Sequence, residues 1–210
     1  YPLSPAEMAV WMERFVREDG LNLIGGCCGT STPHIQALDG MLRRVGGEKY
    51  RPAPVKRNTI WMPSVSSLYT QTPLRQENSY FSIGERRNAN GSKKWRELQE
   101  SGDWDGCVAV GREQAAEGSN ALDICTAFVG RNETAEMSEI ITRFTSSVNA
   151  PLVIDSTETP VIEAALKLHG GKPIINSINF EDGEGPAADR MALARKFGAA
   201  VVALTIDEVG

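Results

Sequence analysis

The chain has 210 residues, of which 41% are hydrophobic and 23% are charged, and its formal net charge is −5. This composition is typical of a globular protein and argues against a disordered chain. Acidic and basic residues are interleaved, so the sequence offers no basic patch for a nucleic acid. No apolar run approaches the about 20 residues that a membrane-spanning helix needs, and we therefore expect no membrane partner.

The cellular compartment is indicated by the N-terminus and by the cysteines. No basic stretch precedes an apolar one at the N-terminus, so we expect no signal peptide. The four cysteines, two of them adjacent, do not make a disulfide framework in a chain of this length. We therefore expect a cytoplasmic protein. The chain also starts without Met and stops after a strand-like run, which predicts an internal fragment of a longer polypeptide.

A helix is predicted over residues 4–16. Ser4 can cap it, Pro5 suits its first position and Glu7 completes a capping box. The apolar residues that follow fall on one helical face. The sequence therefore predicts an amphipathic helix at the start of the chain.

The next predicted elements are a short strand over residues 21–24, which runs into a glycine turn, and a helix from Thr32 to the glycines at 46–47. Beyond them the periodic pattern stops. Residues 50–78 contain several prolines, with Ser and Thr, and no periodic apolar face. We interpret this segment as an interdomain linker or a connection that follows a surface.

Short apolar runs then alternate with helical patterns. The runs predict strands at residues 80–83, 121–124, 152–154, 173–175 and 200–206. Helical patterns begin behind Asn132 and at Thr159-Pro160. This alternation predicts right-handed βαβ units with a parallel sheet, and so an α/β fold. Five strands do not close an eight-stranded (β/α)8 barrel, so a partial barrel and an open five-stranded sheet are both compatible with the pattern.

Polar residues follow most of the predicted strands at the point where the chain leaves the sheet. These residues are Glu85, Asp123, Asp155, Asn176 and the pair Asp207-Glu208. The carboxyl ends of parallel strands meet at one mouth, where α/β proteins bind their ligands. The alternative is that each polar residue only caps the helix that follows it.

The types of these residues indicate a class of ligand. Asp accepts hydrogen bonds from amino and ring N–H groups, whereas Asn both donates and accepts. Together they suit a flat heterocycle with mixed edges. The sequence contains no glycine-rich phosphate loop, and Gly183 and Gly185 are flanked by acids that would repel a phosphate.

Residues 79–210 resemble the barrels of pterin-binding methyltransferases. The resemblance is carried, in order and spacing, by SIGERRNANGSKKW (82–95), LVIDSTE (152–158), IINSIN (174–179) and GAAVVALTIDE (198–208). It implies that this part binds 5-methyltetrahydrofolate. It further implies that Asp155 and Asn176 hold the pterin, with Asp123 as a third contact and Asn88 close by. Asn176 would also be the catalytic candidate, near the reacting N5 atom.

One loop departs from this family. Methionine synthase barrels often read DINMD after the second strand, whereas this chain reads Asp123-Ile124-Cys125-Thr126-Ala127. Asp123 is kept, but the Asn and the second Asp are absent. In this loop the sequence is more similar to the methyltransferase that acts on a corrinoid iron–sulfur protein.

A cysteine pair occupies the glycine turn of residues 25–30. Glycine frees the backbone to aim both Cys27 and Cys28 at one Zn²⁺, although buried cysteines are also commonly inert. The stretch resembles the last strand of zinc-dependent homocysteine methyltransferase barrels, in which both cysteines are zinc ligands and a third lies upstream. That third ligand would precede this chain. Cys107 and Cys125 lack ligand spacing, and we expect them to be structural.

Taken together, the two resemblances point to the cobalamin-dependent methionine synthases. They imply that residues 1–49 end a homocysteine-binding barrel, that residues 50–78 link the barrels and that residues 79–210 begin a pterin-binding barrel, with both barrels incomplete. The implied reaction moves a methyl group from 5-methyltetrahydrofolate to cobalamin, and then to homocysteine held as a thiolate on zinc. Cobalamin would be carried by another domain of the same polypeptide. The alternatives are methyl transfer to a corrinoid iron–sulfur protein, and a pterin-binding fragment without activity of its own.

Overall fold

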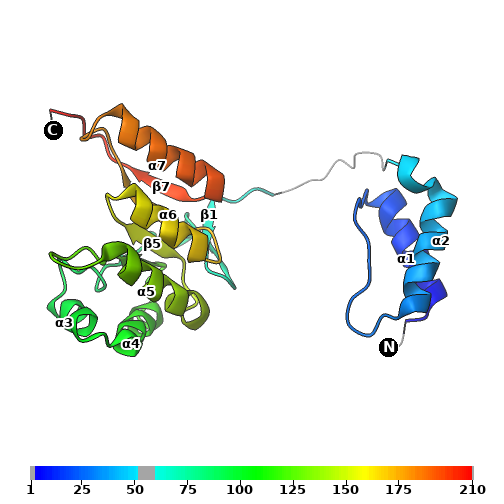
Figure 1. Ribbon diagram of the computed structural model, residues 1–210, viewed down its shortest axis with the longest axis horizontal. Helices are drawn as coiled ribbons and strands as arrows, with labels where there is room; N and C mark the ends of the chain where they lie inside the picture. Colours follow the sequence, from blue (N-terminus) through cyan, green and yellow to red (C-terminus); the bar gives the residue numbers. More distant parts are fainter. Residues whose placement is uncertain (1–2, 52–59, 210) are drawn as a thin grey trace. The chain divides into compact units, whose positions relative to one another are not determined.

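The computed structural model describes residues 3–51 and 60–209. The chain divides into two compact units, Tyr1–Trp61 and Met62–Gly210. Figure 1 shows a pair of helices in the first unit and a layered α/β arrangement in the second. The part of the chain that the structure describes contains no helix long and apolar enough to span a membrane.

The first unit is built on two helices, α1 (Pro5–Glu18) and α2 (Thr32–Val45), followed by the short 3-10 helix η1 (Gly47–Lys49). The predicted capping box is present, because the Ser4 hydroxyl accepts from the Glu7 amide and the Glu7 carboxylate accepts from the Ser4 amide. Gly46 ends α2 at a φ of 126°, a conformation that favours glycine. The two helices pack through a small apolar core that contains Met8, Ala9, Leu38, Met41 and Val45.

The strand predicted over residues 21–24 is not formed. This segment is extended, but none of its residues pairs with a strand in the described part of the first unit. A single strand cannot satisfy its backbone hydrogen bonds without a neighbour. The side chain of Leu23 is accordingly 91% exposed. The prediction was wrong for this unit because the sequence shows the apolar run but not the neighbour that it would need.

A hairpin lies inside the segment predicted as a linker. β1 (Ser64–Ser66) pairs antiparallel with β2 (Gln71–Pro73), and both belong to the second unit. Val65 is fully buried in an apolar cluster with residues of three strands of the main sheet, Ala121, Val153 and Ile174. Three-residue strands are too short to show an apolar period, so the sequence did not reveal them. Residues 52–59 of the predicted linker lie outside the described residues.

The second unit is an α/β domain with a parallel sheet, as the sequence predicted. Its strands are β3 (Ile83–Gly84), β4 (Ala121–Ile124), β5 (Leu152–Asp155), β6 (Ile174–Ile178) and β7 (Ala200–Ala203). Its helices are α3 (Lys93–Ser101), α4 (Trp104–Ala116), α5 (Glu133–Ser147), α6 (Thr159–Leu168) and α7 (Glu184–Phe197). Three predicted strands differ clearly, because β3 starts later than residue 80, β6 continues to Ile178 and not only to residue 175, and β7 ends at Ala203 and not at residue 206.

The five parallel strands lie in sequential order, β3-β4-β5-β6-β7. A doubly wound sheet reverses its order at a switch point, whereas a (β/α)8 barrel does not, so this order is consistent with part of a barrel. Helices cover the sheet in Figure 1. Their main apolar core includes Leu122, Ile124, Leu152, Ile154 and Ile175.

The two faces of the sheet have different surroundings. Successive side chains of a strand alternate between faces, and Ala121, Val153 and Ile174 pack with the hairpin on the face opposite the helices. The same alternation places Asp123, Asp155 and Asn176 on that opposite face. This face is therefore apolar where the strands begin and polar where they end.

Candidate functional site

Three polar residues meet at the carboxyl ends of neighbouring strands. Asp155 of β5 stands directly opposite Asn176 of β6 in the register of the parallel pair. Asp123 of β4 stands opposite Val153, two residues before Asp155 on the same face of β5. The structure therefore brings together the residues that the sequence singled out after these strands.

Asp123 is the most buried of the three, with 2% of its surface exposed. Both carboxylate oxygens are buried, and neither makes a well-formed hydrogen bond to a described residue. Burial raises the pKa of Asp123 to about 7, and the negative charge of Asp155 adds to the rise. The Asn176 side chain lowers this pKa and so favours the carboxylate. The arrangement offers an unsatisfied acceptor to a ligand that carries N–H groups.

Asp155 is half-buried and has a partner from the loop after β3. The Asn88 amide donates to Asp155 Oδ2 at 2.8 Å. Asn88 itself is fixed by a parallel bridge to Cys125 and by the backbone N–H of Asn90, which donates to its side-chain oxygen. The pKa of Asp155 is raised, first by burial and then by the charge of Glu85. All four residues predicted to contact the pterin therefore belong to one cluster, which we call the mouth cluster: Asn88, Asp123, Asp155 and Asn176.

The strand-end residues of the mouth cluster do not cap the helices that follow them. The N-cap residues of α5, α6 and α7 are Asn132, Glu158 and Gly183. Capping therefore does not account for the polar residues that end β4, β5 and β6. Of the other strand-end residues, Glu85 is exposed beside Asn88 on a shallow pocket of about 510 Å³. Asp207 is exposed and accepts from the amide of Val209.

Two buried polar side chains that the sequence did not single out support the mouth. Arg87 is fully buried between β3 and β4, and Gln99 of α3 is 1% exposed. Gln99 donates to the backbone oxygen of Thr126 at 2.9 Å and to the Glu136 carboxylate, which also pairs with Arg131. These contacts hold the loop that departs from the family pattern. Arg and Gln are usually exposed, so no signal in the sequence marks them as buried.

The predicted metal ligands lie in the first unit. Cys27 and Cys28 are both exposed, and their sulfur atoms are 3.5 Å apart. The pKa of Cys27 is lowered by hydrogen bonds from the backbone and side chain of Cys28. Two thiolates bound to one tetrahedral Zn²⁺ at about 2.3 Å would have sulfur atoms about 3.8 Å apart, so the pair fits two of its ligands. Among the described residues no group of three or more possible ligands forms.

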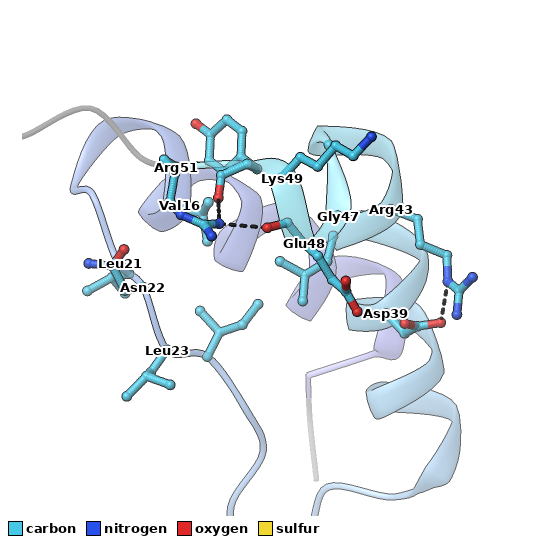
Figure 2. A pocket seen from close by; sticks show the side chains of 14 residues that line it. Val16, Leu21, Asn22, Leu23, Asp39, Arg43, Gly47, Glu48, Lys49 and Arg51 are labelled. Carbon is cyan, nitrogen blue, oxygen red and sulfur yellow. Dashed lines mark hydrogen bonds and ion pairs between the residues drawn. The ribbon is translucent and has the colours of Figure 1, made fainter.

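A pocket also lies in the first unit, and no residue of the mouth cluster lines it. It has a volume of about 910 Å³ and lies beside the extended segment with Leu21, Asn22 and Leu23 (Figure 2). Two of its charged side chains already have partners, because Arg43 pairs with Asp39 and Arg51 donates to two backbone oxygens. None of the site residues that the sequence predicts lines this pocket, so we place the candidate site at the mouth cluster.

The fold and the site together define an α/β domain that gathers acidic and amide groups at the carboxyl ends of its parallel strands. A family model described as "Pterin binding enzyme" matches residues 84–209, more than half of the chain. The chain therefore belongs to the pterin-binding enzyme family. A second model, described as "Homocysteine S-methyltransferase", matches residues 1–42.

Two curated relatives are similar to the whole chain. Methionine synthase from Mycobacterium tuberculosis (strain ATCC 25618 / H37Rv) is 45% identical over 213 residues, and that from Mycobacterium leprae (strain TN) is 43% identical over 213 residues. Both matches include 100% of this chain, but they include only 17% and 18% of the relatives. The chain thus spans less than one fifth of the length of these relatives.

Proposed function

We propose that this chain is part of a methyltransferase that takes a methyl group from 5-methyltetrahydrofolate, and that the second unit binds the pterin. The mouth cluster is the observation that carries the proposal. It presents two carboxylates and two amides at one sheet edge, and a capping role does not explain its strand-end members. The similarity to two methionine synthases supports the same reaction.

The residues of the mouth cluster have distinct roles in this proposal. The carboxylates of Asp123 and Asp155 accept hydrogen bonds from the amino and ring N–H groups of the pterin. Asn88 holds Asp155 in place through its 2.8 Å hydrogen bond. Asn176 binds the ring and provides a hydrogen bond near N5. When the bond between N5 and the methyl carbon breaks, N5 is a poor leaving group unless it is hydrogen-bonded or protonated.

The first unit supplies the other half of the proposed reaction. Residues 1–49 form the end of a homocysteine-binding barrel, and residues 79–210 form the start of a pterin-binding barrel. Residues 50–78 connect the two and include the hairpin that packs on the second unit. Cys27 and Cys28 would hold a zinc ion, with a third cysteine from outside this chain. Bound zinc lowers the pKa of a thiol and would keep homocysteine as the thiolate nucleophile. Cobalamin, bound by another domain of the same polypeptide, would carry the methyl group between the two sites.

The alternative acceptor is a corrinoid iron–sulfur protein. The loop Cys125-Thr126-Ala127 favours this alternative, because it departs from the pattern of methionine synthase barrels. The match of residues 1–42 to homocysteine S-methyltransferases favours homocysteine as the final acceptor, and we therefore prefer it. A pterin-binding protein without methyl transfer would bind methyltetrahydrofolate and leave the methyl group in place.

The test is to titrate 5-methyltetrahydrofolate into the full-length protein with Asp155→Ala or Asn176→Ala. Each change leaves polar groups of the ligand unpaired in a desolvated site, at a cost of about 1–3 kcal/mol. We expect affinity to fall by roughly 5- to 150-fold. Asn176→Ala should also lower kcat if its amide assists the chemical step.

Asn132→Ala is the matched control, because Asn132 is a true helix cap whose side chain accepts from the Ala135 amide at 3.1 Å. This change should lower the free energy of unfolding by about 1 kcal/mol, and with it the melting temperature. The affinity for the pterin should stay unchanged. Unchanged affinity in both Asp155→Ala and Asn176→Ala would contradict the proposed site.

A further inference from the structure

Arg87 is an unusual residue for the interior of a domain. Its side chain has 0% exposure, and its guanidinium lies 5.9 Å from the centre of the Phe144 ring. Nη2 donates to the backbone oxygen of Gly84 at 2.7 Å, and Nε donates to that of Asp123 at 3.1 Å. One side chain therefore joins the end of β3 to the end of β4.

The backbone of Arg87 strengthens this junction. Its carbonyl accepts from the amide of Cys125 at 3.1 Å, and the amide of Ala89 donates to the Cys125 carbonyl at 3.1 Å. The regular pairing of β3 with β4 stops at Gly84 and Leu122, so these contacts continue it toward the mouth. The next residue after Arg87 is Asn88, the partner of Asp155. The junction thus fixes two members of the mouth cluster at once.

The charge of Arg87 lacks an ion-pair partner among the described residues, and its Nη1 atom is buried without a hydrogen bond. A buried cation that pairs with carbonyls alone is costly, which points to a function for it. Burial lowers the pKa of Arg87 to about 10, so the group stays charged at pH 7. Four groups act on the Asp123 carboxylate: Asp155 and Glu85 raise its pKa, and Arg87 and Asn176 lower it.

We propose that Arg87 is a positioning residue of the pterin site, which aligns Asp123 and Asn88 for the ligand. This inference rests on the proposed function. It adds a residue that makes no contact with the ligand and acts through the strand ends. The hydrogen bonds and the charge of Arg87 can be tested separately. The planar guanidinium group makes the hydrogen bonds, and the positive charge lowers the pKa of Asp123.

Arg87→Gln and Arg87→Lys test the two features in the full-length protein. 5-Methyltetrahydrofolate affinity is measured from pH 6 to pH 9, and hydrogen exchange of residues 84–90 and 121–127 is followed by mass spectrometry without ligand. Arg112→Gln is the matched control, because Arg112 also donates to a backbone oxygen, that of Ser147, on an exposed surface.

We expect Arg87→Gln to speed exchange in both segments and to lower affinity at least about tenfold at pH 7. The pH midpoint of binding should rise, because Asp123 loses a cation that favours its ionisation. Arg87→Lys keeps the positive charge but loses the planar guanidinium group. It should therefore speed hydrogen exchange in both segments and leave the pH midpoint of binding unchanged. Arg112→Gln should change neither hydrogen exchange in these segments nor the affinity for the pterin and its pH midpoint.

The inference is overturned if Arg87→Gln and Arg87→Lys bind the pterin with normal affinity, or if Arg87→Gln weakens binding without moving the midpoint. The second result would give Arg87 a structural role only. Failure of the unaltered protein to bind the pterin would contradict the proposed function instead. The ligand-free exchange data would still report whether Arg87 orders the mouth, so the two failures are distinguishable.

Discussion

At the scale of single residues, the burial of Asp123 in the mouth cluster lowers the protein's own stability. The Asp123 carboxylate is buried and makes no well-formed hydrogen bond to a described residue, and burial of a carboxylate in this state is unfavourable. The same feature leaves its acceptor capacity available to a pterin. Residues of this kind are commonly found where stability is given up for function.

Asp123→Asn should therefore stabilise the second unit at high pH. The pKa of Asp123 in the folded state, about 7, lies above the ordinary value of 3.8, so the folded state holds an extra proton between these values. The stability that depends on this proton is fully present below about pH 4 and is lost as pH rises through about 7. The difference corresponds to at most about 4 kcal/mol.

The measurement is the melting temperature of the parent and the Asp123→Asn protein from pH 4.5 to pH 8.5. The advantage of the variant should grow up to about pH 7.5 and then level off. Its pterin affinity should fall, because the carboxylate acceptor is gone. A difference in melting temperature that does not change with pH would show that Asp123 does not titrate in this range.

The sequence predicted three members of the mouth cluster because strand ends can be read from short apolar runs with polar residues, whereas Asn88 was predicted from the family resemblance alone. Asp123, Asp155 and Asn176 all follow such runs. Arg87 and Gln99 could not be predicted, because their burial depends on how the loops fold back over the strand ends. A sequence shows that a residue is charged, but not that neighbouring elements enclose it.

At the scale of elements, α1, α2, α5 and α6 and several strands were predicted from capping residues and apolar periods, whereas α3 and α7 were not predicted. Asn132 caps α5 as expected, and β4 has the predicted bounds. The strands that were missed or wrongly predicted are short and depend on distant partners. The β1–β2 hairpin needs the main sheet beneath Val65, and residues 21–24 need a neighbouring strand to pair with.

The hairpin gives a direct test of this packing. Val65→Ala removes two methyl groups from a site with 0% exposure and should destabilise the second unit by about 1–3 kcal/mol. Gln71→Ala on the exposed strand β2 is the control and should change stability by less than about 0.5 kcal/mol. Chemical denaturation of the full-length proteins gives both values. Equal effects of the two changes would mean that the hairpin does not anchor on the sheet.

At the scale of the whole molecule, the chain joins two units with different chemistry. The first carries an exposed cysteine pair, and the second carries the mouth cluster. The chain covers 17–18% of the methionine synthases that it resembles, so the proposed reaction draws on domains beyond it.

Zinc content tests the role of the first unit. Two thiolates fill half of a four-coordinate site, so tight binding requires the full-length protein. We expect the full-length protein to hold about one zinc ion at the cysteine site, and replacement of both Cys27 and Cys28 by Ala to remove it. Cys107→Ala is the control, because Cys107 is buried in α4. Unchanged zinc content in the double variant would contradict the assignment of Cys27 and Cys28 as zinc ligands.

The most direct test of the central claim is an experimental structure of the full-length protein with 5-methyltetrahydrofolate bound. The account predicts that the pterin ring lies at the carboxyl ends of β4, β5 and β6. Asp123 and Asp155 should accept hydrogen bonds from its N–H groups, and Asn176 should lie within hydrogen-bond distance of the ring. A pterin bound elsewhere, with no contact to Asp155 or Asn176, would contradict the account.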